Sequence, residues 1–447
     1  MELDGNADRT QRPNIIFIVS DDLGFADLGC YGGRPAKFGA VSPLLDSLAA
    51  NGLKFTQGYS NSPVCSPTRF ALMTGRYQYR LRGAAEEPIS IRTRSSATLG
   101  LPPQHPTLPS LLRDSGYRTA LIGKWHMGYP PAFGPLRSGY DEFFGPMSGG
   151  VDYFTHCSST GSHDLWFGED EIDEAGYLTD LISHRAVDYL DRMAGGQAPF
   201  FLSLHYTAPH WPWETRDDQG LAQEVRDNLF HLHGGNIQTY HRMIHHMDEG
   251  IGWLMDALRA KGIADSTLVV FTSDNGGERF SDNWPLVGGK MDLTEGGIRV
   301  PWIAHWPAVI APGRVSEQQC MTMDWSATLL DAAGVAADAN YPLDGVSLLR
   351  VLREPGHSFR RPLHWRMNHR GQRALRDGDW KYLRVDQNDY LFNIPADERE
   401  RANRAAREPE RLMAMREDWE EWNRTMPPIP HDATVSLGYS AKDMPQR

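Results

Sequence analysis

The stretch IIFIVSDD, residues 15–22, is an almost unbroken apolar run that ends in two aspartates. Continuous apolar strands of this kind are typical of a parallel sheet that is covered on both faces. Three further segments show the same pattern: Thr119–Ile122, Pro199–Leu204 and Thr267–Ser273. Helical patterns lie between them, for example from Ser42 to Gly52 and from Tyr240 to Gly262. We therefore expect an α/β fold with a large mixed, mostly parallel sheet sandwiched by helices.

Polar residues follow each of these four predicted strands. They are, in chain order, Asp21-Asp22, Gly123-Lys124-Trp125-His126, Pro209-His210 and Asp274-Asn275. In open α/β sheets, ligands bind beyond the carboxyl ends of the strands. Four strands that each bring polar groups to this edge predict one shared site.

The pattern changes after about Gly356. Short strand patterns follow at Leu363–Met367, Arg373–Leu375 and Trp380–Val385, and a charge-rich segment from Asp397 to Glu421 is predicted to be helical. We therefore expect two units: an N-terminal catalytic α/β domain over residues 1–356, and a small C-terminal antiparallel α+β subdomain with helix and tail over residues 357–447.

Composition excludes several classes of protein. The 447 residues contain 45 Lys and Arg against 57 Asp and Glu, and a net charge of −12 argues against a general nucleic-acid binder. The four cysteines form no C-x-x-C pair, which excludes a zinc ribbon and disfavours a disulfide framework. No apolar run is long enough to span a bilayer, and Met1–Pro13 has no apolar signal core. We expect a cytoplasmic protein that is not membrane-bound, or a periplasmic or secreted one if a leader was removed.

Cys65-Ser66-Pro67-Thr68-Arg69 forms the pattern C-x-P-x-R at the start of a predicted helix. Ser66 is a plausible N-cap, Pro67 suits the first helical position, and Gly75 can end the helix. The positive end of the helix and Arg69 would both favour anionic chemistry beside Cys65. The alternative is a buried, inert cysteine.

The residues Asp21, Asp22, Asp274 and Asn275 offer only oxygen ligands, which suit calcium or magnesium rather than zinc or copper. Carboxylates held close together repel one another unless a cation lies between them. Taken singly, each residue is better explained as a helix cap or turn residue. Taken as two pairs at one sheet edge, they favour a metal site.

A set of basic residues accompanies these carboxylates: Arg69, Lys124, His126, His210 and Lys290. Lys124 and His126 alternate across one residue and would point to the same side of an extended segment. Surface salt bridges are the ordinary role of lysine. However, a protein with a charge of −12 needs a local basic cluster to bind an anion, so we interpret this set as an anion site.

The chain resembles the type I sulfatases of the alkaline phosphatase superfamily and is arylsulfatase-like. The resemblance rests on these segments, in family order: Pro13–Asp22, Cys65–Arg76, Gly123–Gly128, Ala208–Pro212, Ser273–Asn275 and Gly289–Pro301. It extends from Pro13 to the charged C-terminal helix. It implies an alkaline-phosphatase-like fold and a sulfuric ester hydrolase.

The resemblance also implies roles for the candidate residues. A separate maturation enzyme would oxidise Cys65 to formylglycine (3-oxoalanine), and the hydrated aldehyde would be both nucleophile and metal ligand. The residues that would hold one divalent cation with it are Asp21, Asp22, Asp274 and Asn275. The family expectation is Ca²⁺, with Mg²⁺ or Mn²⁺ as alternatives. Arg69 and Lys124 would orient the hydrate, and Lys124, His210 and Lys290 would bind sulfate. His126 would remove the proton that releases sulfate.

Two other functions stay open on sequence alone. One is a phosphodiester or phosphonate monoester hydrolase on the same fold, although Lys124, His126 and Asn275 follow the sulfatase pattern. The other is a relative that only binds an anion or a metal, if Cys65 is never matured. The expected substrate is a small sulfate monoester of the aryl sulfate type, with a sulfated carbohydrate as the rival. The segments Gly83–Pro106, Met147–Gly168 and Trp211–Asn236 are expected to line the pocket, whereas the oligomeric state and the role of the tail after Asp432 are open.

Overall fold

The computed structural model describes residues 12–32, 39–225 and 234–436. Most of the N-terminal stretch used to judge a leader lies outside these residues, as does part of the expected pocket segment 211–236. Within the described ranges, no helix combines the length and the apolar character needed to cross a membrane.

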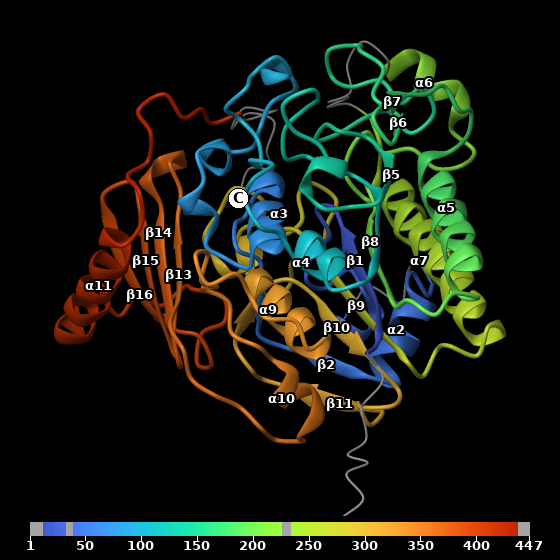
Figure 1. The fold of residues 1–447 in the computed structure, drawn as a ribbon. Helices are drawn as coiled ribbons and strands as arrows, with labels where there is room; N and C mark the ends of the chain where they lie inside the picture. Colours follow the sequence, from blue (N-terminus) through green and yellow to red (C-terminus); the bar gives the residue numbers. More distant parts are fainter. Residues whose placement is uncertain (1–11, 33–38, 226–233, 437–447) are drawn as a thin grey trace, which may run out of the picture.

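A ten-stranded sheet forms the centre of the molecule (Figure 1). Its strands are, in spatial order, β11 (Arg314–Ser316), β2 (Leu53–Phe55), β10 (Trp302–His305), β9 (Thr267–Ser273), β1 (Asn14–Ser20), β8 (Phe200–His205), β4 (Arg118–Gly123), β5 (Glu142–Gly145), β6 (Trp166–Phe167) and β7 (Asp170–Glu171). Neighbours run parallel from β9 to β5, while β10 and β6 join antiparallel. The four predicted strands are therefore confirmed, and they lie side by side as β9, β1, β8 and β4.

Helices cover both faces of this sheet (Figure 1). One face carries α2 (Pro43–Ala50), α5 (Leu178–Met193) and α7 (Ile237–Ala260), and the other carries α3 (Cys65–Thr74), α4 (Leu108–Asp114), α9 (Thr322–Ala332) and α10 (Leu349–Arg353). The side chains of β1 alternate between two cores, because successive residues of a strand point to opposite faces. Ile16 and Ile18 pack with α5 and α7, whereas Ile15 and Phe17 pack with α3 and α9. This explains why β1 is apolar throughout.

The smaller elements complete the chain. They are the parallel pair β3 (Gly58–Tyr59) and β12 (Cys320–Met321), the short helices α6 (Gln219–Val225) and α8 (Glu295–Ile298), and 3₁₀ turns at Gly29–Tyr31, Gln78–Arg80, Gly83–Ala85, Ile91–Thr93, Leu136–Ser138 and His369–Gly371.

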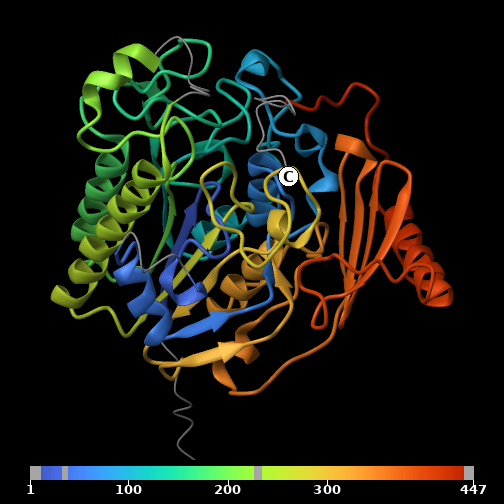
Figure 2. The same ribbon diagram turned by 180° about the vertical axis from the view of Figure 1, so that it is seen from behind.

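A four-stranded antiparallel sheet stands at one side of the molecule, with α11 (Pro409–Arg424) packed against it (Figure 2). Its strands are β13 (Leu363–Arg366), β14 (Arg373–Asp377), β15 (Trp380–Val385) and β16 (Asn388–Asn393). The sequence predicted three of the four and missed β16. The expected helix from Asp397 was wrong at its start. The Asp397 carboxylate instead accepts hydrogen bonds from the backbone N–H groups of Arg401 and Ala402, which closes a turn at the start of a loop.

Candidate active site

The parallel strands bring the predicted polar residues to one edge of the large sheet. The residues that follow β1, β4, β8 and β9 are, in that order, Asp21 and Asp22, Lys124 and His126, His210, and Asp274 and Asn275. Cys65 reaches this edge from the start of α3, and Lys290 from the loop that follows β9. All the sequence-predicted site residues are buried and lie in this one region.

Three carboxylates converge on Cys65. The ligand atoms of Asp21, Asp22, Asp274 and Cys65 all lie within 4.8 Å of one another. Burial, and then the charge of Asp21, raise the pKa of Asp274 to about 6. Asn275 donates to Asp22 at 2.7 Å, while its own buried Oδ1 has no hydrogen-bond partner among the described residues. Hard oxygen donors and an unpaired amide oxygen are a donor set that fits a divalent cation such as Ca²⁺.

Two lysines approach these carboxylates from different elements. Lys124 Nζ lies 2.5 Å from Asp21 Oδ2, and Lys290 Nζ lies 2.6 Å from Asp22 Oδ2 and 3.7 Å from Glu278. Burial alone would raise the pKa of Asp22, but Lys290 and then His210 outweigh it and hold this pKa well below the ordinary value. The site therefore combines a compact anionic centre with cations positioned to attract a further anion.

Arg69 holds the strand ends together. Its guanidinium donates to Asp274 Oδ2 at 2.8 and 3.1 Å and lies 3.9 Å from Asp21. It also donates to the Lys124 carbonyl at 3.2 Å, so one side chain links α3 with the ends of β1, β4 and β9. Arg69 thus binds the Asp274 carboxylate and the Lys124 carbonyl at the same time, which requires the several N–H donors of a guanidinium group.

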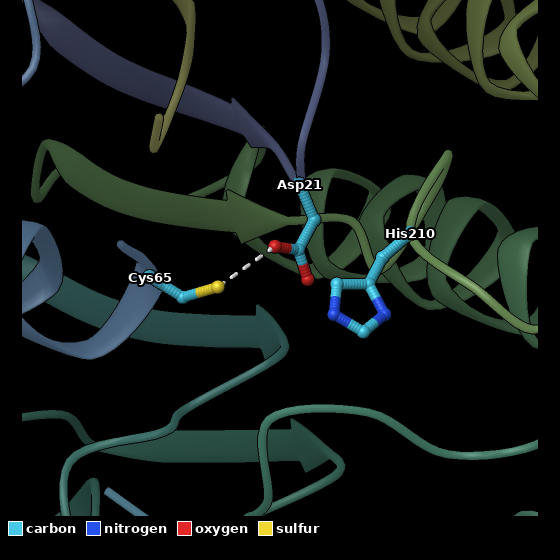
Figure 3. A group of neighbouring side chains, drawn as sticks. All are labelled: Asp21, Cys65 and His210. Carbon is cyan, nitrogen blue, oxygen red and sulfur yellow. Dashed lines mark hydrogen bonds between the residues drawn. The ribbon is translucent and has the colours of Figure 1, made fainter. Parts of the chain in front are cut away.

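Cys65 points at the carboxylate group, with its Sγ 3.5 Å from Asp21 Oδ1 (Figure 3). The residue is only 1% exposed. Burial raises the pKa of the Cys65 thiol well above its ordinary value, even though Lys124 and Lys290 oppose this effect. The unmodified thiol is therefore a poor nucleophile, because the reactive form of a thiol is the thiolate.

The start of α3 differs from the sequence expectation. The helix begins at Cys65 itself, Val64 is the N-cap residue, and Pro67 occupies the third helical position. Ser66 does not cap the helix, because its Oγ accepts a hydrogen bond from the Ile89 backbone N–H instead. The predicted C-terminal end is confirmed: Gly75 follows the helix with φ 64°, the left-handed conformation that favours glycine.

His126 is oriented by a backbone carbonyl. Its Nε2 lies 2.8 Å from the Ile89 oxygen, and because a carbonyl can only accept, Nε2 carries the proton. Its Nδ1 is buried and has no partner among the described residues. Burial, and then Lys124, lower the pKa of His126 well below the ordinary value. The imidazole is therefore neutral, with Nδ1 able to accept a proton.

His210 forms a close group with Asp21 and Cys65, since the ligand atoms of the three residues lie within 4.8 Å of one another (Figure 3). Its Nδ1 donates to the Trp211 carbonyl at 2.6 Å, and its Nε2 lies 3.6 Å from Asp22. Burial, and then Lys290, lower the pKa of His210 to about 3. His210 is thus also neutral here, held by its own chain neighbour.

A pocket of about 700 Å³ opens onto these groups. Cys65, His126, His210 and Lys290 line one part of it. Met291 lies beside Lys290 in the lining, and the other walls come from four segments: residues 88–93, residues 148–150 with Ser159 and Thr160, Trp211, and Thr434–Ser436. The first three lie in the segments that the sequence predicted to line the pocket. Many of these residues carry hydroxyl groups, and the pocket exceeds the needs of a bare sulfate ion.

Sequence reasoning missed three contributors. Glu278 lies beside Lys290 and groups with Asp22 and His210, but its position in a loop gave no periodic signal. The Ile89 carbonyl orients His126 through its backbone, which no residue type reveals. The wall formed by Thr434–Ser436 comes from a segment far along the chain.

Comparisons with known proteins agree with this geometry. The sulfatase family model matches residues 13–335. The N-acetylgalactosamine-6-sulfatase of Canis lupus familiaris is 33% identical over 368 residues, which cover 78% of this chain and 67% of that protein. Arylsulfatase J of Mus musculus is 30% identical, over 77% of this chain and 56% of that protein. The crystal structure of Ps i-CgsB in complex with k-i-k-neocarrahexaose is 33% identical with a TM-score of 0.81, covering 92% of this chain and 93% of that one.

Proposed function

The chain belongs to the sulfatase family and hydrolyses sulfate esters, and on that premise we propose that a formylglycine made from Cys65 is its nucleophile. The observation that supports this most directly is the position of Cys65 Sγ, 3.5 Å from Asp21 in the group of three carboxylates. The raised pKa of the thiol supports it as well, because an unmodified Cys65 would be inert. A separate enzyme that converts the thiol to the aldehyde is then required.

The proposed cation site consists of Asp21, Asp22, Asp274, Asn275 and the hydrated aldehyde at position 65. Its donors suit Ca²⁺. When bound, the cation would lower the pKa of a hydrate hydroxyl and polarise the sulfate oxygens. Arg69 and Lys124 would keep the donors in place, since each contacts one of these carboxylates.

The reaction that these side chains support has two steps. One hydroxyl of the hydrate passes its proton to Asp21, whose Oδ1 lies beside position 65, and attacks sulfur, so that the bond from sulfur to the ester oxygen breaks. The ester oxygen leaves with a proton from Lys290, or from His210 after the negative charge of the bound ester has raised the pKa of this histidine and protonated it. His126 Nδ1 then takes the proton of the second hydroxyl, the carbonyl re-forms, and sulfate departs. Lys124, His210 and Lys290 would stabilise the charge on the sulfate oxygens.

For the substrate we propose a sulfated carbohydrate in preference to a simple aryl sulfate. The pocket has hydroxyl side chains along its walls and Trp211 beside His210, features that suit a sugar with hydroxyl groups and an apolar ring face. One relative cleaves N-acetylgalactosamine 6-sulfate by its name, and one similar structure holds a neocarrahexaose.

The test compares kcat/KM of matured protein on a sulfated hexosamine and on 4-nitrophenyl sulfate, with Cys65→Ala as the blank. Mass spectrometry of the Cys65 peptide shows whether the aldehyde is present. We expect the aldehyde, and a preference for the sugar ester. A clear preference for the aryl ester would overturn the substrate assignment. If fully active protein still carried the Cys65 thiol, the assignment of a formylglycine nucleophile would be overturned.

A further inference from the structure

The chain after α11 returns to the active site. We name residues 427–436 the C-terminal strap. In Figures 1 and 2 it is the red segment that follows α11 and reaches the region above α3. Glu87 and Val435 form a parallel bridge, in which Glu87 N donates to Thr434 O at 3.0 Å and Ser436 N donates to Glu87 O at 2.9 Å. The tail that the sequence left open thus docks, up to Ser436, on its own chain.

The buried carboxylate of Glu86 anchors the C-terminal strap. Glu86 is 1% exposed and accepts hydrogen bonds from both the backbone N–H and the hydroxyl of Thr434, the former at 3.0 Å. Arg82 connects Glu86, at 2.6 Å, with Asp432, at 3.1 Å. Detaching the strap would deprive the buried Glu86 of two donors, which is costly for a charged group. The strap is therefore a built part of the fold.

Its last three residues face substrate space. Thr434, Val435 and Ser436 line the same pocket as Cys65 and Lys290. Among the described residues, no hydrogen bond or ion pair joins these three to the catalytic side chains. They form part of the wall around the pocket and not part of the reacting centre.

We infer that the C-terminal strap selects the alcohol portion of the sulfate ester, through the pocket wall formed by Thr434–Ser436. This inference rests on the proposed function for the class of substrate. The sulfate group would reach Cys65 and the basic residues, while the sugar would meet the strap. Selectivity of this kind arises because a wall that fits one alcohol excludes another by contact.

The position of the C-terminal strap also allows a second role, in catalysis and not in selectivity. Glu87 pairs with the strap, and two residues later the Ile89 carbonyl holds His126. The strap could therefore act on catalysis by positioning His126. That role would change the turnover of every substrate equally and would leave binding selectivity unchanged.

The experiment measures binding in a Cys65→Ala background, which removes both turnover and the need for maturation. Calorimetry gives Kd for a sulfated hexosamine and for inorganic sulfate, which needs only the reacting end of the pocket. Ser436→Trp narrows the pocket at a side chain that makes no hydrogen bond to the residues that the structure describes. Ile429→Trp is the matched control, because Ile429 is 38% exposed on the same strap and does not line this pocket.

We expect Ser436→Trp to weaken hexosamine binding by about tenfold or more while sulfate binding changes less than about threefold, and Ile429→Trp to change neither. The inference would be overturned if Ser436→Trp left hexosamine binding unchanged, or weakened it only as much as sulfate binding. It would also be overturned if the Cys65→Ala parent did not bind the hexosamine at all. Selective binding without any hydrolysis by matured protein would instead contradict the proposed function and leave the strap's role standing.

Discussion

Two buried clusters of charged residues in this molecule use similar side chains in opposite arrangements. In the first, Lys381 of β15 lies between Glu295 and Glu400, 3.0 and 2.9 Å from their carboxylates, where the small sheet meets the rest of the chain. Lys381 is fully buried. One ammonium group bridges both carboxylates, so the cation occupies the centre of the cluster.

In the proposed catalytic cluster, the carboxylate oxygens occupy the centre. Asp21, Asp22 and Asp274 converge within 4.8 Å, and each is paired with its own cation from a different element. This cluster also opens onto a pocket. The difference indicates that a central lysine makes a structural joint, whereas converging oxygens with peripheral cations make a site that can accept both a metal ion and an anion.

The largest expected effect is on stability at the Lys381 cluster. Lys381→Met would leave Glu295 and Glu400 buried without their bridging ammonium, and we expect a loss of about 3–5 kcal/mol in the free energy of unfolding. Urea denaturation measures it. Lys261→Met is the control, since Lys261 pairs with Asp191 at the surface and should cost about 1 kcal/mol or less. Equal losses in the free energy of unfolding for the two variants would show that Lys381 has no special structural role.

Lys124 provides the corresponding test at the proposed catalytic cluster, where the measured quantity is activity and not stability. We expect Lys124→Ala to lower kcat/KM for a sulfate ester by about 10²–10³, because it removes one buried charged donor from the reacting centre. In Lys381→Met, by contrast, the folded fraction should keep near-normal kcat/KM. The assay is steady-state hydrolysis with the folded fraction checked by circular dichroism. Near-normal hydrolysis by Lys124→Ala would contradict the assignment of the site.

Calcium should stabilise the protein through the proposed catalytic cluster and not through the Lys381 cluster, and this effect is expected to be smaller. At a free Ca²⁺ concentration of 100 times Kd, binding to the folded state adds about 2.7 kcal/mol of stability. We expect Ca²⁺ to raise the Tm of the parent and of Lys381→Met relative to EDTA, and to have little effect on Asp274→Asn. The same rise in Asp274→Asn would place the cation elsewhere.

In a third buried group, at Glu214, a proton takes the place of a cation. Burial, and then the charge of Asp152, raise the pKa of Glu214 to about 9. The folded state thus keeps a proton that the unfolded chain loses near its ordinary pKa of 4.5. Stability from this group is therefore complete below about pH 4.5 and is lost progressively as the pH rises towards 9.

Glu214→Gln should flatten this dependence. The amide can donate towards Asp152 while its oxygen accepts from the Tyr153 backbone N–H, as Glu214 does at 3.1 Å. Between about pH 5 and 9, we expect a smaller fall in Tm in Glu214→Gln than in the parent, because the amide has no proton to lose over this range. Thermal unfolding across this range checks it. Parallel pH profiles would show that Glu214 is ionised in the folded protein.

The sequence predicted that the candidate site residues would lie together, because these residues belong to local patterns. Apolar strands with polar residues directly after them predicted that Asp21 and Asp274 meet at one edge, and C-x-P-x-R identified Cys65. The C-terminal strap had no such pattern. Thr434 depends on Glu86, far away in the sequence, so only the folded chain shows the contact. The bridge at Lys381 was missed for the same reason, since a lysine in a short strand is normally exposed.

The order of synthesis gives the C-terminal strap a further consequence. Residues 434–436 leave the ribosome on the order of tens of seconds after Cys65, at about 5–20 residues per second. During that interval the nascent chain has no strap to complete the pocket wall. Cys65 is 1% exposed once the fold is complete, so an enzyme that acts on its thiol has its best access before the last residues are made. The proposed conversion of Cys65 would therefore precede the completion of the pocket wall by the strap.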